Sequence, residues 1–194
     1  KVIVFHLVNG ASRFAGKNGK AVDTSMGLTP LEGLIMGTRS GDMEPAIMEF
    51  IAKKENLDIA GYERSELEAG VLGLSGVSSD FRDIEEAAEA GNDRAAKALA
   101  AYNYRVVKYI GAYTAAMDGV DVIAFTAGLG ENCKSMRKAV CEHLSYLGIK
   151  IDDEANSVRG KDIVISTPDS KVKVMVIPTN EELAIARETL ALVK

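Results

Sequence analysis

The sequence has 194 residues but no tryptophan, and it contains only four prolines, two histidines and two cysteines. Two histidines are too few for a histidine-rich metal site, so zinc chemistry of that kind is excluded. Cys133 and Cys141 lie about 12 Å apart along one expected helix, which is too far for a disulfide within that helix. We therefore expect two free thiols in a reducing cytoplasm.

A basic excess and long apolar runs are also missing. Lysine and arginine number 23 against 28 aspartates and glutamates, a net charge of −5. Because nucleic-acid backbones require a basic surface, no nucleic-acid partner is expected. No run approaches the roughly 20 apolar residues of a membrane span, and no signal peptide is recognisable. A small anionic ligand stays possible, since backbone amides and one or two cations can bind phosphate in an acidic protein.

The patterns that are present predict strands interleaved with helices. Val2–Leu7 is expected to be a strand, and two strands flanking Asn18-Gly19, Ser12–Ala15 and Lys20–Val22, complete a three-stranded antiparallel meander. Later strands are expected at Asp121–Thr126, Ile163–Ser166 and Lys171–Ile177. Helices are expected to start at Thr29-Pro30 and to cover Pro45–Lys54, Glu63–Gly70, Ile84–Ala90, a long segment from Asn92 or Asp93 to Met117, Ser135–Leu147 and Glu181–Val193. This order indicates one α/β domain, residues 1–194, with a mixed sheet flanked by helices.

The long helix carries an apolar stripe at three- and four-residue spacing: Leu99, Tyr102, Val106, Ile110, Tyr113 and Met117. Such a stripe is typical of a buried helix face. We expect it to pack in the core, with a dimer contact as the alternative.

Three glycine-rich turns are candidates for ligand contact: His6–Ser12, Gly73–Asp80 and Gly128–Asn132. Glycine lets the backbone approach a ligand closely and turn its amides toward an anion. The third turn is the strongest candidate, because it is expected between a strand end and a helix start, where the helix dipole favours phosphate. Each turn by itself is weak evidence, because glycine turns are usually plain chain connections.

Four side chains each have two possible roles. Arg39, between glycines, could stabilise charge on a transferring phosphoryl group, or it could be exposed or paired with Asp42. Glu181 could bind Mg²⁺, or it could be a first-turn acid that suits the helix dipole. His6 could contact phosphate or form a buried hydrogen bond. Phe81 could stack on a base or anchor its loop in the core.

Taken in order, these segments resemble the acetate kinase family. The matching stretches are His6–Ser12, Val22–Gly27, Thr29–Gly33, Met36–Asp42, Gly76–Arg82, Phe125–Asn132 and Pro178–Glu182. The resemblance covers essentially the whole chain and corresponds to the family's C-terminal, nucleotide-binding half. Because the chain opens directly on an apolar strand, we expect the N-terminal half upstream of Lys1. The resemblance implies a ribonuclease-H-like domain of the ATPase superfamily that includes actin, sugar kinases and heat-shock chaperones.

The resemblance also implies an activity and a set of site residues. It implies transfer of the γ-phosphoryl group of ATP to acetate, giving acetyl phosphate and ADP, with Mg²⁺, by a cytoplasmic homodimer. Arg39 would stabilise the transferring phosphoryl group and Glu181 would bind the metal. The implied nucleotide contacts are His6, Leu7, Val8, Asn9, Gly10, Asp80, Phe81, Arg82, Gly128, Leu129, Gly130, Glu131 and Asn132.

One residue departs from the family pattern: Val8 stands where the family usually has glycine. A β-branched residue resists positive φ and adds bulk, so nucleotide phosphates are expected to fit less well. The family's other half supplies the acetate pocket and further catalytic side chains, so this chain alone is expected to bind ATP weakly and not to turn over acetate. The alternatives are a propionate or butyrate kinase, and a non-catalytic nucleotide-binding or assembly module.

Overall fold

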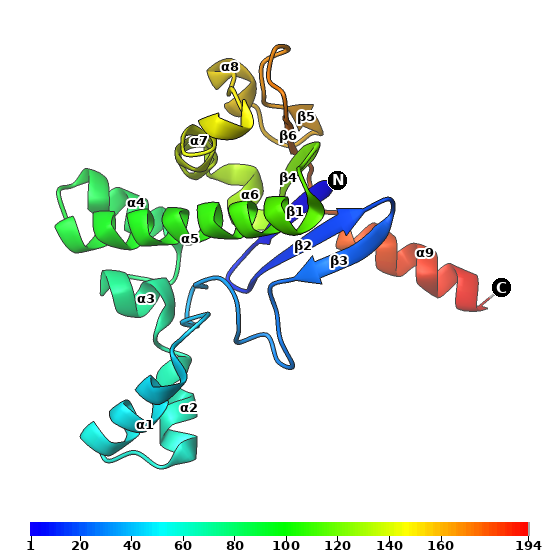
Figure 1. Ribbon diagram of the computed structural model, residues 1–194. Helices are drawn as coiled ribbons and strands as arrows, with labels where there is room; N and C mark the ends of the chain where they lie inside the picture. Colours follow the sequence, from blue (N-terminus) through cyan, green and yellow to red (C-terminus); the bar gives the residue numbers. More distant parts are fainter. Residues whose placement is uncertain (194) are drawn as a thin grey trace.

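A six-stranded mixed sheet organises the computed structural model, which describes residues 1–193 (Figure 1). Its strands are β1 (Val2–Leu7), β2 (Ala11–Lys17), β3 (Lys20–Thr24), β4 (Val122–Thr126), β5 (Ile163–Val164) and β6 (Lys173–Val176), in the order β3-β2-β1-β4-β6-β5. The first three are antiparallel, whereas β4 is parallel to both β1 and β6. The expected meander, the mixed sheet and the α/β class are therefore confirmed.

The hairpin between β2 and β3 turns at the predicted dipeptide. Asn18 and Gly19 have φ of 53° and 75°, and Lys17 lies opposite Lys20. Two consecutive residues with positive φ are typical of the tight turn that matches the twist of paired strands. Both strands extend beyond their predicted bounds.

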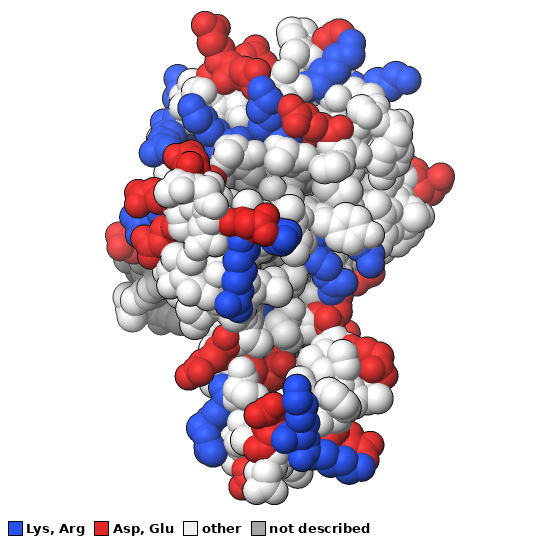
Figure 2. Space-filling view, turned by 90° about the vertical axis from the view of Figure 1, so that its left-hand side faces the viewer, with Lys and Arg blue, Asp and Glu red and all other residues white. Residues whose placement is uncertain are grey.

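Helices surround the sheet unevenly. They are α1 (Pro45–Lys54), α2 (Ile59–Glu66), α3 (Gly70–Ser75), α4 (Phe81–Glu89), α5 (Asp93–Met117), α6 (Ala127–Asn132), α7 (Lys134–Glu142), α8 (Asp153–Asn156) and α9 (Glu181–Val193), with a 3-10 turn at Ser145–Leu147. None of the helices within residues 1–193 combines the length and the apolar character needed to cross a membrane. Figure 1 shows α5 crossing the sheet while α9 projects away from it. In Figure 2, α1 and α2 form a lower lobe, and acidic and basic side chains are interspersed over the visible face.

The long helix α5 belongs to the core, as predicted. Asn92 is its cap, because its side chain accepts hydrogen bonds from the amides of Arg94 and Ala95 at 3.1 Å each. Tyr102, Val106, Ile110, Tyr113 and Met117 on the predicted stripe are buried, although Leu99 is only partly so. The stripe packs over the sheet, where Phe5 of β1 stacks on Phe125 of β4 with centroids 5.7 Å apart.

An unpredicted arginine lies between the sheet and α5. Arg13 of β2 is 1% exposed, and its guanidinium carbon lies 3.7 Å from the ring centroid of Tyr109. Burial lowers the pKa of Arg13 to about 10, so the side chain is still a cation at neutral pH. The aromatic ring supplies the attraction that a carboxylate would usually provide.

The predicted helix start at Thr29-Pro30 is wrong, because residues 25–44 form an irregular loop. Gly33 has φ of 110°, which no right-handed helix accepts, and its amide donates to the Asp42 carboxylate at 2.8 Å. The Asp42 amide in turn donates to the Gly33 carbonyl at 2.9 Å. These hydrogen bonds across the loop take the place of the helical hydrogen bonds that Pro30 and Glu32 favour locally.

Several other boundaries differ from prediction. The helix predicted at Ile84–Ala90 begins at Phe81, and the strand predicted at Ile163–Ser166 ends at Val164. The helix predicted at Glu63–Gly70 is divided: α2 ends at Glu66, and α3 occupies the first part of the glycine-rich Gly73–Asp80 turn. Gly70 permits this start, because a Cβ there would lie 2.5 Å from the Met36 carbonyl oxygen. The helix predicted at Ser135–Leu147 begins one residue earlier and ends at Glu142, before the 3-10 turn.

Candidate functional site

Two adjoining cavities open beside the ends of β1 and β4, and the start of α9 borders the smaller one. The larger has a volume of about 680 Å³ and the smaller about 340 Å³, and Val8 and Gly128 line both. The larger volume falls within the range of small-molecule sites. Of the predicted residues, the larger cavity is lined by Val8, Asn9, Asp80, Phe81, Arg82, Gly128, Leu129 and Asn132. The smaller is lined by His6, Val8, Gly128 and Glu181.

The turn after β1 supplies the first wall. The Asn9 carbonyl accepts the Gly37 amide at 2.9 Å, which ties this turn to the loop of residues 25–44. Leu7 is fully buried and faces the core, so it lines neither cavity. Within residues 1–193 the non-glycine residues with positive φ are Asn18, Asn56, Asp118 and Ala127. Val8 is not among them, so its departure from glycine adds bulk at the rim without backbone strain.

Arg39 lies beside this turn but lines neither cavity. Its Nη1 donates to the Pro30 carbonyl at 3.2 Å and lies 3.5 Å from the place a Cβ on Gly10 would take. The reading in which Arg39 pairs with Asp42 is wrong. Asp42 instead accepts hydrogen bonds from Arg105, at 2.7 Å, and from the Tyr109 hydroxyl, at 2.6 Å.

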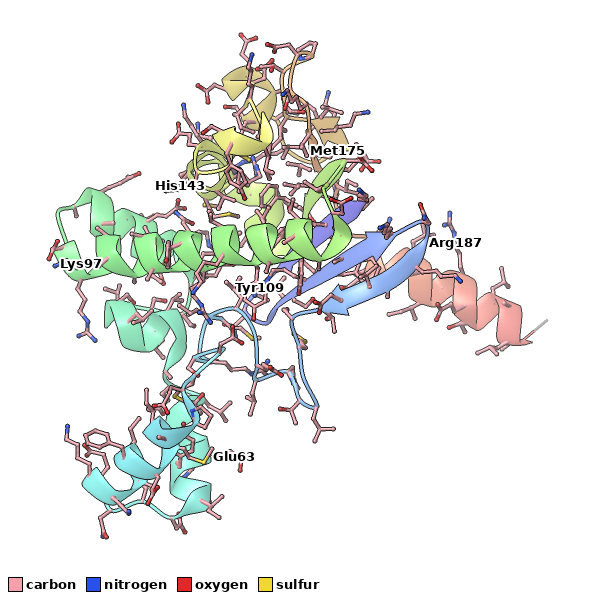
Figure 3. The ribbon with its side chains drawn as sticks, viewed as in Figure 1. Glu63, Lys97, Tyr109, His143, Met175 and Arg187 are labelled. Atoms are coloured by element: carbon pink, nitrogen blue, oxygen red, sulfur yellow. The ribbon has the colours of Figure 1, made fainter. Side chains whose placement is uncertain are left out.

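The Asp42 contacts fix the loop that carries Arg39. Asp42 joins the Gly33 amide within the loop to two side chains of α5, Arg105 and Tyr109. Tyr109 extends from α5 toward β2 and the loop (Figure 3). Since α5 is anchored in the core, these bonds hold the loop at Asp42, three residues after Arg39.

The start of α4 forms the second wall of the larger cavity. The Asp80 side chain caps α4 by accepting the Arg82 amide at 2.9 Å, and it also forms an ion pair with the Arg82 guanidinium. Hydrogen bonds from Arg82 lower the pKa of Asp80 to about 2. Phe81 is 8% exposed and meets Tyr102 edge to face at 4.6 Å. The ring of Phe81 is therefore anchored in the core, and the residue also lines the larger cavity.

The segment Gly128–Asn132 is a helix, α6, and not the open glycine loop that was predicted. Its first residue, Ala127, has φ of 64°, a left-handed conformation that is uncommon for alanine. Gly128 and Leu129 face the cavities, whereas Gly130 is buried against the backbone of Phe125 and lines neither. Glycine at 130 therefore serves close packing of α6 on β4.

Glu131 also lines neither cavity. Its Oε1 accepts a hydrogen bond from the Ala127 amide at 2.7 Å and another from the Thr179 amide at 2.9 Å. This carboxylate oxygen therefore faces the protein backbone, and a direct contact between Glu131 and a nucleotide stays a prediction.

The acidic start of α9 enters the smaller cavity. Asn180 caps α9 by accepting the Leu183 amide at 3.1 Å, and Glu181 follows it. The Glu181 side chain is 74% exposed and its Oε1 lies 3.8 Å from Nε2 of His6. Within residues 1–193 no group of three or more metal-ligating side chains forms. One exposed carboxylate still fits Mg²⁺, because this ion is usually held by one or two carboxylates together with phosphate oxygens and water.

Sequence reasoning missed several residues of the cavity walls. Glu85, Cys133 and Arg159 line the larger cavity. Glu85 accepts a hydrogen bond from Cys133 Sγ at 3.2 Å, and burial raises the pKa of that thiol to about 11. No local pattern marks these residues, because only the fold brings them next to the glycine-rich turns.

Comparison with known proteins gives one consistent result. A family model described as the acetokinase family matches residues 1–187. The acetate kinases of Lachnoclostridium phytofermentans and Agathobacter rectalis are each 65% identical to the chain, which is covered completely and spans 49% of either protein. The solved acetate kinase of Porphyromonas gingivalis superposes with a TM-score of 0.94 at 51% identity, covering all of this chain and 49% of its own. A solved propionate kinase from Francisella tularensis superposes with a TM-score of 0.89 at 39% sequence identity. The match covers 96% of this chain and 48% of that kinase. The chain spans about half the length of the relatives it matches.

Proposed function

Because the chain belongs to the acetokinase family, we propose that it is the nucleotide-binding half of an enzyme that transfers the ATP γ-phosphoryl group to acetate. The products would be acetyl phosphate and ADP. The observation that carries the proposal is the pair of adjoining cavities that share Val8 and Gly128. One is large enough for a nucleoside, and the other contains the carboxylate of Glu181.

The nucleoside would occupy the larger cavity and the phosphates would cross the shared rim. Asp80, Phe81 and Arg82 would form one wall for the adenosine, with Leu129 and Asn132 opposite. Arg82 is 84% exposed at its side chain, so it is free to turn toward a ligand while its amide stays in the α4 cap. The phosphates would then extend past Gly128, where the lack of a side chain leaves room.

Glu181 would hold Mg²⁺ together with the phosphate oxygens, and the ion, when bound, would offset phosphate charge. His6 lies within the same cavity and would contribute a hydrogen bond to phosphate. Arg39 would approach the transferring phosphoryl group from the Gly10 side and stabilise its charge through its planar guanidinium. These roles agree with phosphoryl transfer, in which positioning and charge stabilisation supply most of the catalysis.

Calorimetry tests nucleotide binding by the chain itself. We expect weak binding of ATP–Mg²⁺, with no hydroxamate formed from acetate, because the acetate pocket of the family lies in the other half. Glu181→Gln should weaken ATP binding in the presence of Mg²⁺ and leave binding without Mg²⁺ unchanged. Glu188→Gln, an exposed acid farther along α9, is the matched control. Turnover of acetate by the chain alone would contradict the half-site proposal.

A propionate or butyrate kinase is the second candidate, favoured by the match to the Francisella tularensis propionate kinase. Comparing acetate, propionate and butyrate as substrates of the full-length enzyme distinguishes these kinases.

A non-catalytic nucleotide-binding or assembly module is the third candidate function, and the bulk of Val8 at the rim favours it. Failure of both the native chain and Val8→Gly to bind ATP–Mg²⁺ would support a purely structural role.

We also propose a homodimer and a cytoplasmic location. Helix α1 supports the first, because none of its residues is buried and Met48 and Phe50 are 51% and 64% exposed. Sedimentation equilibrium of the full-length protein tests it, with Phe50→Asp expected to shift the equilibrium toward monomer. The two free cysteines are compatible with a reducing compartment.

A further inference from the structure

Glu131 connects two segments that are distant in sequence and adjacent in the site. Its Oε1 accepts hydrogen bonds from the Ala127 amide at 2.7 Å, the Thr179 amide at 2.9 Å and the Thr179 hydroxyl at 3.2 Å. Ala127 begins α6 directly after β4, whereas Thr179 lies between β6 and α9. One carboxylate oxygen therefore holds both segments.

Both segments line the smaller cavity. Ala127 and Gly128 of α6 contribute to its lining, as do Thr179, Asn180 and Glu181 at the start of α9. Ala127 has φ of 64°, so the bond to its amide fixes a turn that alanine rarely adopts. Thr179 stands two residues before Glu181, so the same carboxylate also limits where the acid of α9 can lie.

We propose that Glu131 is a positioning residue for the metal–phosphate part of the site: its carboxylate fixes the spacing between the Gly128 rim and Glu181. This inference rests on the proposed function, since it assigns Glu131 to the Mg²⁺ dependence of nucleotide binding. It replaces the role that the family resemblance implies, a direct nucleotide contact. Three donors already converge on Oε1, and the side chain lines neither cavity.

Two substitutions separate positioning from direct contact. Glu131→Gln keeps an oxygen acceptor at the same reach, so ATP–Mg²⁺ affinity should fall by about threefold or less. Glu131→Ala removes the acceptor, and Mg²⁺ affinity in the ternary complex should fall by about tenfold or more, as when a supporting partner of a ligand is lost. Glu142 is an exposed acid at the end of α7. Its variant Glu142→Ala should leave the ATP–Mg²⁺ affinity and the Mg²⁺ affinity of the ternary complex unchanged. Equal losses in the glutamine and alanine variants would overturn positioning in favour of direct contact.

A double-mutant cycle with Glu181→Ala tests the route of the effect. If Glu131 acts through Glu181, Glu131→Ala should cause almost no further loss of Mg²⁺ dependence once Glu181 is gone. A purely structural role would instead reduce ATP affinity with and without Mg²⁺ by the same factor. Additive losses in the cycle would overturn the proposal.

Amide hydrogen exchange of the unliganded protein tests the contacts without nucleotide. The amides of Ala127 and Thr179 should exchange faster in Glu131→Ala than in the native chain, and only slightly faster in Glu131→Gln. Unchanged exchange would overturn the inference even if nucleotide binds. A different outcome is faster exchange in Glu131→Ala while the native chain does not bind ATP–Mg²⁺. That outcome would confirm the hydrogen bonds of Glu131 but reject the proposed function and the link to Mg²⁺ dependence.

Discussion

Truncation of Phe81 to alanine is expected to destabilise the chain far more than it affects nucleotide binding. The ring is 8% exposed and packs edge to face on Tyr102 of α5. Removing a buried phenylalanine side chain costs about 3 to 5 kcal/mol, because transfer energy and packing are both lost. For a chain of this size each kcal/mol lowers Tm by about 2 to 4 °C, so Tm should fall by roughly 10 °C. Thermal unfolding followed by circular dichroism measures the change.

Phe50 provides the matched control, since its side chain is 64% exposed on α1. At a protein concentration where the chain is monomeric, Phe50→Ala removes the same atoms and should change the unfolding free energy by about 0.5 kcal/mol or less. The reasoning is refuted if Phe81→Ala and Phe50→Ala lower Tm equally. That result would mean that the ring of Phe81 is not part of the core.

Phe81→Leu separates the anchoring role from base stacking. Leucine fills much of the same core space, so most of the stability should return. A leucine side chain has no π face, so a base stacked on Phe81 would bind the variant much more weakly. We expect ATP–Mg²⁺ affinity in calorimetry to be close to that of the native chain. A large loss of affinity at nearly native Tm would identify Phe81 as a stacking residue instead.

Three further predictions concern buried groups. Arg137→Lys should destabilise the chain by about 3 kcal/mol in urea unfolding, because the buried guanidinium donates three hydrogen bonds that an ammonium cannot reproduce. Burial raises the pKa of Cys133 to about 11 and that of Cys141 to about 12, above the usual 9.0 of the unfolded chain. Stability should therefore fall as pH rises from 9 to 11, where only the unfolded thiols ionise, and replacing both cysteines by alanine should flatten this slope in urea titrations. Gly37→Ala would place a Cβ 1.5 Å from Asn9 Oδ1, so calorimetry should show weaker ATP–Mg²⁺ binding at a nearly unchanged Tm.

The strands and the long helix could be predicted because their patterns are local. Alternation of apolar residues marks β1, and the Asn18-Gly19 dipeptide fits a turn with two positive φ angles. The three- and four-residue spacing along α5 specifies a buried face wherever the helix lies. Family resemblance then identified the segments that meet at the two cavities.

The helix start at Thr29-Pro30 failed for a reason that lies outside its own segment. Local chemistry favours a helix there, but Asp42 binds the Gly33 amide and is itself held by α5. The Gly128–Asn132 prediction failed in the opposite direction, because glycines that suggest an open loop permit close packing of a short helix instead. In both places long-range contacts outweighed local preference.

The sequence by itself determined the α/β class, the order of most elements and the family, because hydrophobic spacing, turn chemistry and ordered motifs are properties of neighbouring residues. Only the tertiary structure decided which motif residues face a cavity. Leu7, Gly130 and Glu131 stand inside motifs and yet turn toward the protein, whereas Glu85 and Arg159 belong to no motif and line the larger cavity. The direction of a side chain depends on packing between segments far apart in the chain, and that information is absent from any single stretch of sequence.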